Sequence, residues 1–537
     1  MEIQETTEFK NTRGILEKSL KFIRGRCTKN GAFDANRLDE YQYAIYNLAL
    51  SFSELEAARS LSNYALSSGS FEKRLAVCFF AEVIQTINGR LLASSQDFGS
   101  LGKVPLGTSF ISEQLSAENL SEIGQEALAR KCDFVEAELT ESQKLIKKTF
   151  FQFAEQRVAP ISQNIHRFNK SIPDALLKEL SSLGCFGLSI PQRYGGLCPD
   201  NKEDNLNMIL VTEELSRASL GAAGSLITRP EIMARALLSG GSEEQKEYWL
   251  PKIASGEKLC AIAITEPDYG SDVASLELKA KPVDNGWILS GSKTWSTFAG
   301  RADVLLVLAR TDPKKSLSHR GLSLFMVEKP SFMGEEFEVK QSVGGVLSGT
   351  AIPTVGYRGM HSYQLFFDDF FVPNTNLIGE REGISKGFYF TMQGLTGGRI
   401  QTAARACGLI QAAIEKTIRY TQDRKVFLKP LADYQLTRVK FARMTMHLCA
   451  ARTFTYAVGK LLNQGEGQME ASLVKLFSCR ASEWITREAM QLHGGVGYAE
   501  ETEVGRYWLD ARVLSIFEGT EETLALKVIG RRLIESA

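Results

Sequence analysis

Histidine is scarce in this sequence, and its cysteines form no recognisable pattern. Only five histidines occur among the 537 residues, and they are widely scattered, so a histidine-based metal site is not expected. The nine cysteines are odd in number, widely spaced and without a CxxC pair. This excludes a disulfide framework or a zinc site and favours small core residues in a reducing compartment. We therefore expect no metal.

An excess of either charge is also missing. Lys plus Arg and Asp plus Glu are both 63, so the formal net charge is zero. This argues against a nucleic-acid-binding surface over the whole protein and permits oligomerisation, because self-repulsion is small. Residues 1–5 are polar and acidic, unlike a secretory signal or a mitochondrial presequence, and no apolar run approaches the ~20 residues of a membrane span. We expect a cytoplasmic protein that binds neither nucleic acid nor membrane.

Several common catalytic motifs are absent. No GxGxxG follows a predicted strand, so a Rossmann-type dinucleotide site is excluded, and residues 286–293 only approximate a P-loop inside a predicted strand. There is no GxSxG and no HExxH, which removes the usual signatures of α/β-hydrolases and zinc proteases.

The patterns that are present predict helices on both sides of a β segment. Apolar residues recur at helical spacing from about 10 to 130 and again from about 138 to 258. From about 259 to 375 short apolar runs separated by turn signals, such as Asp284-Asn285-Gly286, predict strands. Helical spacing returns from about 383 to the end, in helices long enough for a bundle. The fold class is therefore predicted to be mainly α with a central β domain.

Five uncommon segments occur in the last four hundred residues. They are Cys260-Ala261-Ile262-Ala263-Ile264-Thr265-Glu266-Pro267-Asp268-Tyr269-Gly270-Ser271-Asp272, Gly291-Ser292-Lys293-Thr294-Trp295-Ser296-Thr297, Arg424-Lys425-Val426-Phe427, Gln491-Leu492-His493-Gly494-Gly495-Val496-Gly497-Tyr498 and Ile516-Phe517-Glu518-Gly519-Thr520. In this order and spacing, on an α–β–α pattern, they resemble the acyl-CoA dehydrogenase family. The resemblance covers about residue 138 to the C-terminus.

The resemblance implies a fold and a cofactor. The implied domains are a helical domain at 137–258, a β-barrel-like domain at 259–376 and a four-helix bundle at 377–537, preceded by an extra helical region at 1–136. The family binds FAD between the β domain and the bundle with help from a neighbouring subunit, so a homodimer or homotetramer is expected. Electrons from reduced flavin are expected to pass to an electron-transfer flavoprotein.

Phe517-Glu518-Gly519-Thr520 resembles the family motif that carries the catalytic base, which makes Glu518 the predicted base. Abstraction of a proton α to a thioester needs a carboxylate held near the carbon in a site that excludes water. Gly519 permits a turn that exposes the side chain to substrate. The competing interpretation is a surface residue before a helix capped by Thr520. Some family members carry the base elsewhere, at the position of Gly398, but glycine cannot act as one.

The resemblance places further residues at cofactor positions: Ile262, Ile264, Thr265, Gly270, Ser271, Trp295, Thr297, Arg424, Phe427, Leu431, Gln491, Gly494, Gly495, Thr520 and Glu522. Among these, Arg424 and Phe427 correspond to positions that reach the FAD of a neighbouring subunit. Val426 replaces a hydroxyl-bearing residue, so one cofactor hydrogen bond is in doubt. Taken alone, Trp295 is more often a core tryptophan, and Glu522 a partner of a helix dipole.

The implied reaction is α,β-dehydrogenation of an acyl-CoA. Glu518 takes the α-proton while a hydride leaves the β-carbon for the flavin, and the thioester carbonyl is polarised by the Glu518 backbone N–H and a flavin ribityl hydroxyl. The N-terminal extension and the stretches 221–230, 354–361 and 397–405 resemble members acting on (2S)-methylsuccinyl-CoA, which becomes mesaconyl-CoA in the ethylmalonyl-CoA pathway.

This substrate ends in a carboxylate, which needs a cationic partner when buried. Arg229 is the predicted partner, at even odds with a surface salt bridge, and Arg399 and Arg358 are weaker candidates. Ser271 is also placed near substrate. The extension at 1–136 is a regulatory or partner-binding module or, as we prefer, a helical cover that extends the dimer or shields the core.

Four alternatives are considered. A general short- or branched-chain acyl-CoA dehydrogenase and an acyl-CoA oxidase share the chemistry but differ in substrate or electron acceptor. A DNA-associated flavoprotein on this fold requires a basic C-terminal surface, and the mixed charge of 383–537 does not favour it. An intact Glu518 argues against a non-catalytic scaffold.

Overall fold

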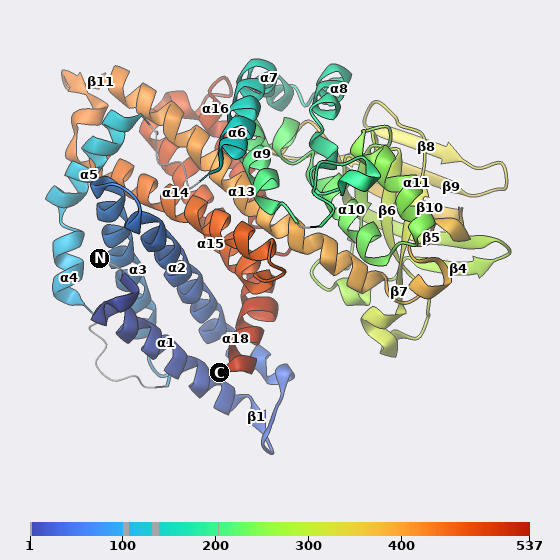
Figure 1. Ribbon diagram of the computed structural model, residues 1–537, viewed down its shortest axis with the longest axis horizontal. Coiled ribbons are helices and arrows are strands. Elements are labelled where there is room, and N and C mark those ends of the chain that lie inside the picture. The colour runs from blue at the N-terminus through green and yellow to red at the C-terminus, as the bar shows by residue number, and fades with distance from the viewer. Residues whose placement is uncertain (1–2, 100–106, 132–138, 202) are drawn as a thin grey trace. The chain divides into compact units, whose positions relative to one another are not determined.

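The computed structural model describes residues 3–99, 107–131, 139–201 and 203–537. It shows a mostly helical chain with one curled central sheet (Figure 1), which confirms the predicted fold class. The chain divides into two compact units, Met1–Lys144 with Thr402–Ala537, and Leu145–Gln401. The predicted domain limits remain predictions, because this division follows contacts rather than sequence order.

The unit Leu145–Gln401 contains a run of helices before its sheet. They are α6 (Glu141–Phe153), α7 (Ala159–Arg167), α8 (Asp174–Ser182), α9 (Asn205–Ala218), α10 (Thr228–Gly240) and α11 (Glu243–Ala254), with π-helical turns at Ala154–Val158 and Leu220–Gly224. The start of α11 is defined by a local hydrogen-bond pattern at Ser242. Ser242 accepts from the Gln245 backbone N–H while the Gln245 side chain accepts from the Ser242 N–H, so both form a capping box.

Eight strands form the sheet of this unit. They are β3 (Cys260–Ala263), β4 (Lys279–Val283), β5 (Gly286–Thr297), β6 (Val304–Arg310), β7 (Leu322–Glu328), β8 (Glu336–Lys340), β9 (Val346–Ile352) and β10 (Ser362–Pro373). Their order is β3-β6-β4-β5-β10-β9-β8, with β7 also paired to β6. The predicted turn at 284–286 joins β4 to β5, and Asn285 adopts the left-handed conformation typical of such hairpins.

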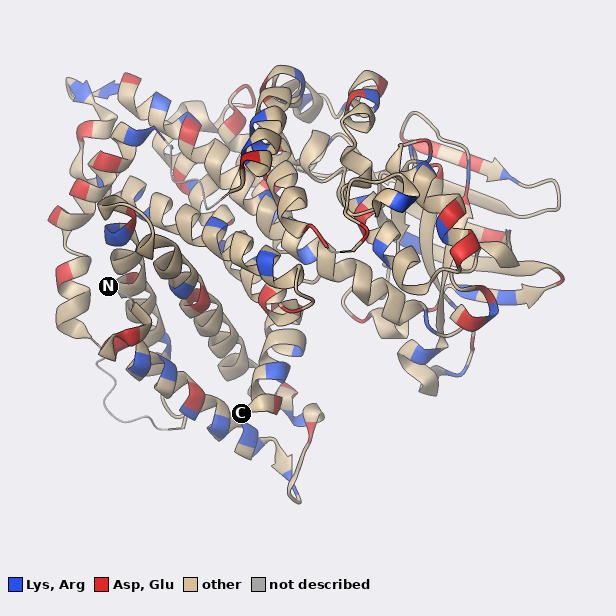
Figure 2. Ribbon diagram, viewed as in Figure 1, with Lys and Arg blue, Asp and Glu red and all other residues tan. Residues whose placement is uncertain are grey.

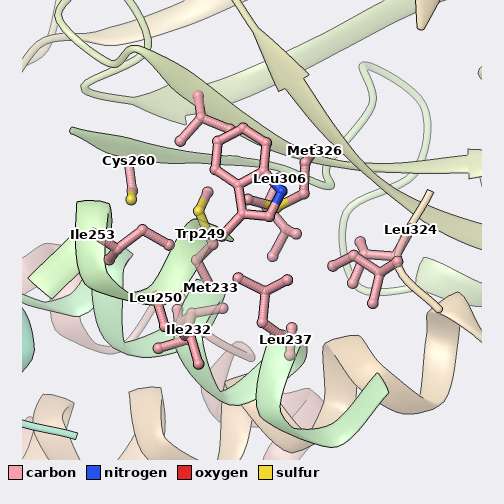
Figure 3. Packing of buried hydrophobic residues seen from close by; sticks show 14 of the residues in the cluster. Ile232, Met233, Leu237, Trp249, Leu250, Ile253, Cys260, Leu306, Leu324 and Met326 are labelled. Carbon is pink, nitrogen blue, oxygen red and sulfur yellow. The ribbon is translucent and has the colours of Figure 1, made fainter. Parts of the chain in front are cut away.

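Strand β6 shows how this sheet is buried on both faces. Alternate side chains of a strand point to opposite faces, and every residue of β6 is buried. Leu306 faces the cluster formed with α10 and α11, where Figure 3 shows Trp249 and Met233 opposite Leu306 and Met326. Its neighbour Leu305 faces the second cluster. Each fully buried leucine contributes about 1.5–3 kcal/mol, so the two clusters make the sheet a rigid platform.

In its described residues, the unit formed by Met1–Lys144 and Thr402–Ala537 has helices and two short β-hairpins. Its N-terminal helices are α1 (Thr7–Arg26), α2 (Gln42–Leu66), α3 (Ser70–Ala93), α4 (Thr108–Gln114) and α5 (Ala117–Arg130). Its C-terminal helices are the later part of α13 (Gly387–Asp423), α14 (Gln435–Leu462), α15 (Gln468–His493), α16 (Glu503–Leu514), α17 (Glu521–Thr523), the π-helix η12 (Leu524–Gly530) and α18 (Arg531–Ser536).

The N-terminal helices share one core with the C-terminal helices. Figure 1 shows α2 and α3 beside α14 and α15, and contacts join these elements. Helix α5 crosses α14 at Gly124, where a Cβ atom would lie 1.8 Å from the Arg438 carbonyl oxygen. Buried Glu82 of α3 accepts from Arg443 at 2.8 Å and lies 3.0 Å from His447, both on α14. The extension is therefore part of this unit and not a separately folded module.

Helix α3 is the one described helix that is long and apolar enough to cross a membrane. Two thirds of its most apolar window is buried inside the structure, which is the environment of a core helix. Its two acidic residues are paired: Glu72 with Arg130, and Glu82 with Arg443. Eight cysteines are buried and free of disulfides, as expected for small core residues, and Cys132 lies outside the described residues.

Candidate active site

Glu518 lies on a short loop between α16 and α17. Glu518 and Gly519 both have left-handed backbone conformations, with φ of 55° and 94°. Glycine adopts this conformation freely, as predicted for Gly519, but glutamate does so at a cost of about 1–2 kcal/mol. The Thr520 side chain accepts from the Thr523 backbone N–H and caps α17. The loop thus has a defined and strained shape, which is a feature of functional sites.

The Glu518 carboxylate is held by two side chains of α13. It accepts from the Thr402 hydroxyl at 3.0 Å and from the Arg405 guanidinium at 3.0 Å. Thr402 and Arg405 are three residues apart and therefore share one face of the helix. Arg405 is fully buried, and only 11% of the Glu518 side chain is exposed. The interpretation of Glu518 as a surface residue is thus excluded, and its site is polar rather than purely apolar.

In the other unit, a buried ion pair joins two of the predicted cofactor segments. Lys293 of β5 donates to the Glu266 carboxylate and to the Ile264 carbonyl, both at 2.8 Å. Glu266 also accepts from the backbone N–H groups of Glu277 and Leu278. Burial lowers the pKa of Lys293 to about 8, although pairing with Glu266 opposes this shift. The pair fixes the segment after β3 against β5.

Trp295 is the most unusual residue of this region. It lies in β5 where the register with β10 shifts between Tyr363 and Leu365, and its φ is 56°. A β-bulge can re-aim a side chain, and such bulges are frequent beside active sites. The Trp295 side chain is 57% exposed, whereas the adjacent Ser296 is fully buried. The alternative of a core tryptophan is therefore wrong for this chain.

The remaining predicted residues of this unit surround the same edge. The Thr294 backbone N–H donates to the Thr265 carbonyl at 2.8 Å, which brings Thr265 next to Trp295. Gly270 and Ser271 are exposed in the following loop. Thr297 shares a hydrogen bond of 2.9 Å with Ser362. The side chains of Ile262 and Ile264 pack against the hydrophobic core.

Two further predicted segments meet at the far end of α13. Residues Phe427 and Leu428 form the tip of the hairpin between β11 (Lys425–Val426) and β12 (Lys429–Pro430), with φ of 46° and 70°. Their side chains are 92% and 99% exposed. Large apolar side chains rarely occupy such a turn, and here they face solvent. This tip is an apolar surface that lacks a covering partner within the described part of the chain.

The second segment follows α15. The His493 ring stacks on Tyr420 with centroids 4.3 Å apart, which joins the ends of α15 and α13. Gln491, Gly494 and Gly495 are exposed there, and a Cβ on either glycine would meet nothing within 4 Å. Arg424 is also exposed. At 1.5 Å per residue, Arg424 lies about 28 Å along α13 from Arg405, which contacts Glu518.

The last predicted cofactor residues have local roles in this structure. Leu431 is half-buried in a 3₁₀ turn after β12, and Glu522 is exposed in the first turn of α17. The position of Glu522 also suits a helix-dipole partner, the alternative named from sequence. The structure brings Glu518 close to Thr520 and Glu522, but it groups Arg424, Phe427, Gln491, Gly494 and Gly495 elsewhere.

The chemistry of these groups fits FAD. An exposed indole at a strained bulge offers a face for a planar ring. Hydroxyls and an open glycine backbone beside it, at Thr265, Ser271 and Gly270, offer donors and close approach for the polar parts of the cofactor. The structure therefore contains a suitable flavin-side surface in one unit and the predicted base in the other.

Arg229 belongs to a third group of predicted residues, in the unit Leu145–Gln401. It is buried near the start of α10, where it donates to the Ser225 carbonyl and, at 2.9 Å, to the Tyr357 hydroxyl. The Tyr357 ring lies 6.0 Å from the guanidinium. Gly221 packs so closely on this loop that a Cβ would lie 2.3 Å from the Arg358 carbonyl oxygen. The stretches 221–230 and 354–361, singled out from sequence, thus meet in space.

The weaker arginine candidates are placed differently. Arg358 donates to the backbone carbonyls of Thr354 at 3.0 Å and His166 at 2.7 Å, so it stabilises the loop itself. Arg399 is half-buried on α13. The alternative of a surface salt bridge for Arg229 is wrong, because its side chain is buried and its contacts among the described residues are with Ser225 and Tyr357.

Several residues around these sites were not predicted. Tyr357 and Arg405 lie in stretches singled out from sequence, but no role was assigned to either side chain, and Lys475 carries no local signal. The partners of all three are distant in sequence. Lys293 and Glu266 could have been found, since each is a charged residue in a short strand-like segment otherwise rich in small and apolar residues. Such charges are seldom buried unless paired.

Comparison with known proteins matches three family models in order. They are the N-terminal, middle and C-terminal domains of acyl-CoA dehydrogenase, at residues 140–257, 261–370 and 385–534. The (2S)-methylsuccinyl-CoA dehydrogenase of Cereibacter sphaeroides is 35% identical over 97% of this chain and 96% of its own.

Solved structures of similar proteins match most of the chain. Butyryl-CoA dehydrogenase from Megasphaera elsdenii is 32% identical, with a TM-score of 0.67, over 74% of this chain and 100% of its own. A glutaryl-CoA dehydrogenase from Mycobacterium smegmatis, solved in complex with FADH2, is 28% identical, with a TM-score of 0.64, over 74% of this chain and 95% of its own. The chain therefore belongs to the acyl-CoA dehydrogenase family and is an FAD-dependent oxidoreductase that acts on CH–CH groups.

Proposed function

We propose that this enzyme oxidises (2S)-methylsuccinyl-CoA to mesaconyl-CoA and passes the electrons to an electron-transfer flavoprotein. The single observation that carries the choice of substrate is the environment of Arg229. Butyryl-CoA, the substrate in the name of the Megasphaera relative, ends in an alkyl group, whereas methylsuccinyl-CoA ends in a carboxylate. A buried cation such as Arg229 of α10 suits a carboxylate.

The Arg229 guanidinium is buried without a carboxylate among its contacts in the described part of the chain. Its hydrogen bonds to Ser225 and Tyr357 use two of five N–H groups. A buried charge costs free energy unless it is paired, and the bidentate partner that guanidinium prefers is a carboxylate. The free carboxylate of methylsuccinyl-CoA would supply that partner, and the Tyr357 hydroxyl would orient the guanidinium.

The relationship with the Cereibacter protein supports the same choice. The identity of 35% extends over 97% of this chain, so it includes the N-terminal extension. The butyryl-CoA dehydrogenase is matched over its whole length by only 74% of this chain. The match to the relative named for methylsuccinyl-CoA thus includes the extension, whereas the match to the butyryl-CoA dehydrogenase leaves about a quarter of this chain uncovered.

In the proposed reaction, residues of this chain remove one proton and polarise one carbonyl group. Glu518 accepts the α-proton, and Thr402 and Arg405 hold its carboxylate in place from α13. The Glu518 backbone N–H polarises the thioester carbonyl, which favours loss of that proton. Bound FAD would supply the acceptor for the hydride that leaves the β-carbon as the carbon–carbon double bond forms. Trp295 and the hydroxyls of Thr265 and Ser271 would hold the cofactor.

We also propose that the active enzyme contains at least two chains. Arg424 lies about 28 Å along α13 from Arg405, too far for both ends to serve one flavin ring. The exposed Phe427 and Leu428 beside Arg424 are suited to cover the cofactor of a second copy. This arrangement agrees with the role that the family resemblance gives to Arg424 and Phe427.

The test compares two thioesters that differ at one group. 2-Methylbutyryl-CoA has a methyl group where methylsuccinyl-CoA has its carboxylate. We would mix each, without oxygen, with the wild-type enzyme and with Arg229→Gln, and follow loss of flavin absorbance. Loss of a buried charged contact costs about 3 kcal/mol, so Arg229→Gln should lower kcat/KM for methylsuccinyl-CoA about 100-fold. The value for 2-methylbutyryl-CoA should stay the same or rise.

Arg193→Gln is the matched control, because Arg193 is exposed at the surface of the same unit. It should leave both substrates unaffected. Equal losses for both substrates in Arg229→Gln would show that Arg229 supports only the fold. Rapid bleaching of the wild type by butyryl-CoA or isobutyryl-CoA, but not by methylsuccinyl-CoA, would make the protein a general short- or branched-chain dehydrogenase. Direct consumption of oxygen would instead indicate an oxidase.

A further inference from the structure

The loop that carries Glu518 is anchored on both sides of that residue by a lysine. Lys475 of α15 is buried, and its ammonium donates to the carbonyls of Phe517 at 2.7 Å and Gly519 at 2.5 Å. Hydrogen bonds from a charged donor are stronger than neutral ones. They fix the peptide groups that flank Glu518 and therefore the direction in which its side chain leaves the backbone.

A second anchor comes from the N-terminal extension. The Tyr46 hydroxyl, on α2, donates to the carboxylate of Glu521, the first residue of α17. Arg480 of α15 donates to the same carboxylate oxygen at 2.5 Å and to the Tyr46 oxygen at 3.2 Å. Burial and the bond to Glu521 raise the pKa of Tyr46 to about 12, so its hydroxyl keeps its proton and remains a donor. The cluster lies three residues beyond Glu518.

Helix α2 and the residues just before it also contact the chain that follows Glu521. Asp39 pairs with Lys527 at 2.5 Å, and Ile45 packs on Gly530, where a Cβ would lie 2.2 Å from the Ile45 Cγ2 atom. Both Lys527 and Gly530 belong to the π-helix η12, a form often found at functional sites. The extension therefore contacts the base-bearing segment along its length rather than at one point.

We propose that the N-terminal extension is a positioning element for the catalytic base, acting through Tyr46 and the Glu521–Arg480 pair together with Lys475. This inference rests on the proposed role of Glu518. Two successive left-handed residues persist only when their surroundings hold them. Lys475, on a helix of the bundle, holds the loop at Phe517 and Gly519. Tyr46, on a helix of the extension, holds Glu521, where the loop ends. The family models match from residue 140 onward, so the Tyr46 contact is an addition to the matched family domains.

The test removes one hydroxyl from the intact, FAD-loaded protein. In Tyr46→Phe, the rate of flavin bleaching by saturating substrate without oxygen should fall about tenfold, because the base samples misaligned positions. KM should change less than twofold, since no substrate contact is altered. The isotope effect with α-deuterated substrate should increase, because proton removal becomes more rate-limiting. A residue that merely supports the fold would lower Tm without changing the isotope effect per bound flavin.

Tyr43→Phe is the matched control, since Tyr43 is an exposed tyrosine one turn earlier on α2. It should keep the wild-type rate and isotope effect. If Tyr46→Phe does not fold, Glu521→Gln tests the same contact, and its rate should also fall about tenfold. A wild-type rate and isotope effect in a folded, flavin-loaded Tyr46→Phe or Glu521→Gln would overturn the inference.

Glu518→Gln separates this inference from the function on which it rests. An inactive Glu518→Gln with a fully active Tyr46→Phe would reject the role of the extension alone. A fully active Glu518→Gln would reject the base assignment and, with it, the positioning role. A slow Tyr46→Phe with an inactive Glu518→Gln and a normal Tyr43→Phe is the expected result.

Discussion

Replacement of Glu518 by glutamine should abolish proton removal while it preserves the loop. Glutamine has the same length, so its amide oxygen can accept from Arg405 in place of the carboxylate oxygen now 3.0 Å away. Its amide N–H can donate to the Thr402 hydroxyl, which can act as donor or acceptor. Both hydrogen bonds survive, but the bond to Arg405 becomes one to a neutral acceptor. We expect a loss of about 1 kcal/mol of stability.

The effect on catalysis should be much larger than the effect on folding. A positioned general base contributes about 10²- to 10⁴-fold to the rate of a proton transfer. Because Glu518 is the only base assigned, we expect the upper end of this range, equivalent to about 5 kcal/mol of activation free energy. The measurement is single-turnover bleaching of the flavin without oxygen, normalised to bound FAD so that the small loss of stability does not contribute.

Glu466→Gln makes the same chemical change in an exposed loop of the same unit and serves as the control. It should bleach at the wild-type rate. A Glu518→Gln enzyme that retains FAD and bleaches within tenfold of wild type would refute the reasoning, since the α-proton would then go to another group.

Three further outcomes follow from particular contacts. Burial raises the pKa of Glu82, but His447 and Arg443 outweigh it and lower the pKa to about 2 from 4.5. Glu82 thus contributes about 3 kcal/mol of stability above pH 4.5, which is lost as pH falls towards 2. In denaturant titrations, the difference in free energy of unfolding between wild type and Glu82→Gln should be largest above pH 4.5 and should shrink as pH falls towards 2. A difference that does not change with pH would contradict this. Lys293→Met should lower stability by about 3–5 kcal/mol in the same assay, because it leaves a buried carboxylate without its cation, and an unchanged midpoint would reject the ion pair. Phe427→Ser should leave Tm of the FAD-free chain unchanged but increase loss of FAD on dialysis about tenfold, whereas equal retention would argue against a role in cofactor binding.

Local sequence patterns were sufficient for the order of the elements and for the family. Strand β6 is a continuous apolar run, as expected for a strand buried on both faces. The hairpin turn at Asn285 and the capping box at Ser242 depend on residues at most three apart. The motif around Glu518 likewise lies within a few residues. Such features can be predicted from sequence because backbone preferences and apolar periodicity depend on residues within one or two helical turns of each other.

Exposure and pairing could not be predicted in the same way. Trp295 would be buried in most proteins, and only the bulge between β5 and β10 turns it outward. The sequence could not decide whether Arg229 is buried or forms a salt bridge at the surface. The loop that carries Tyr357 packs against Arg229 and buries it. Both outcomes depend on strands and loops that are distant in the chain.

The N-terminal extension shows most clearly what the sequence alone could not predict. Its helical periodicity predicted helices, and the preferred interpretation was a cover for the core. That interpretation stays a prediction. The tertiary structure adds that the extension packs into one unit with the C-terminal helices and that Tyr46 contacts Glu521, 475 residues away. A contact of this kind leaves no periodic trace, because it depends on how two helix faces meet rather than on the residues beside either partner. Sequence therefore predicts which residue is the base, and only the packing of distant helices shows which side chains hold that residue and its loop.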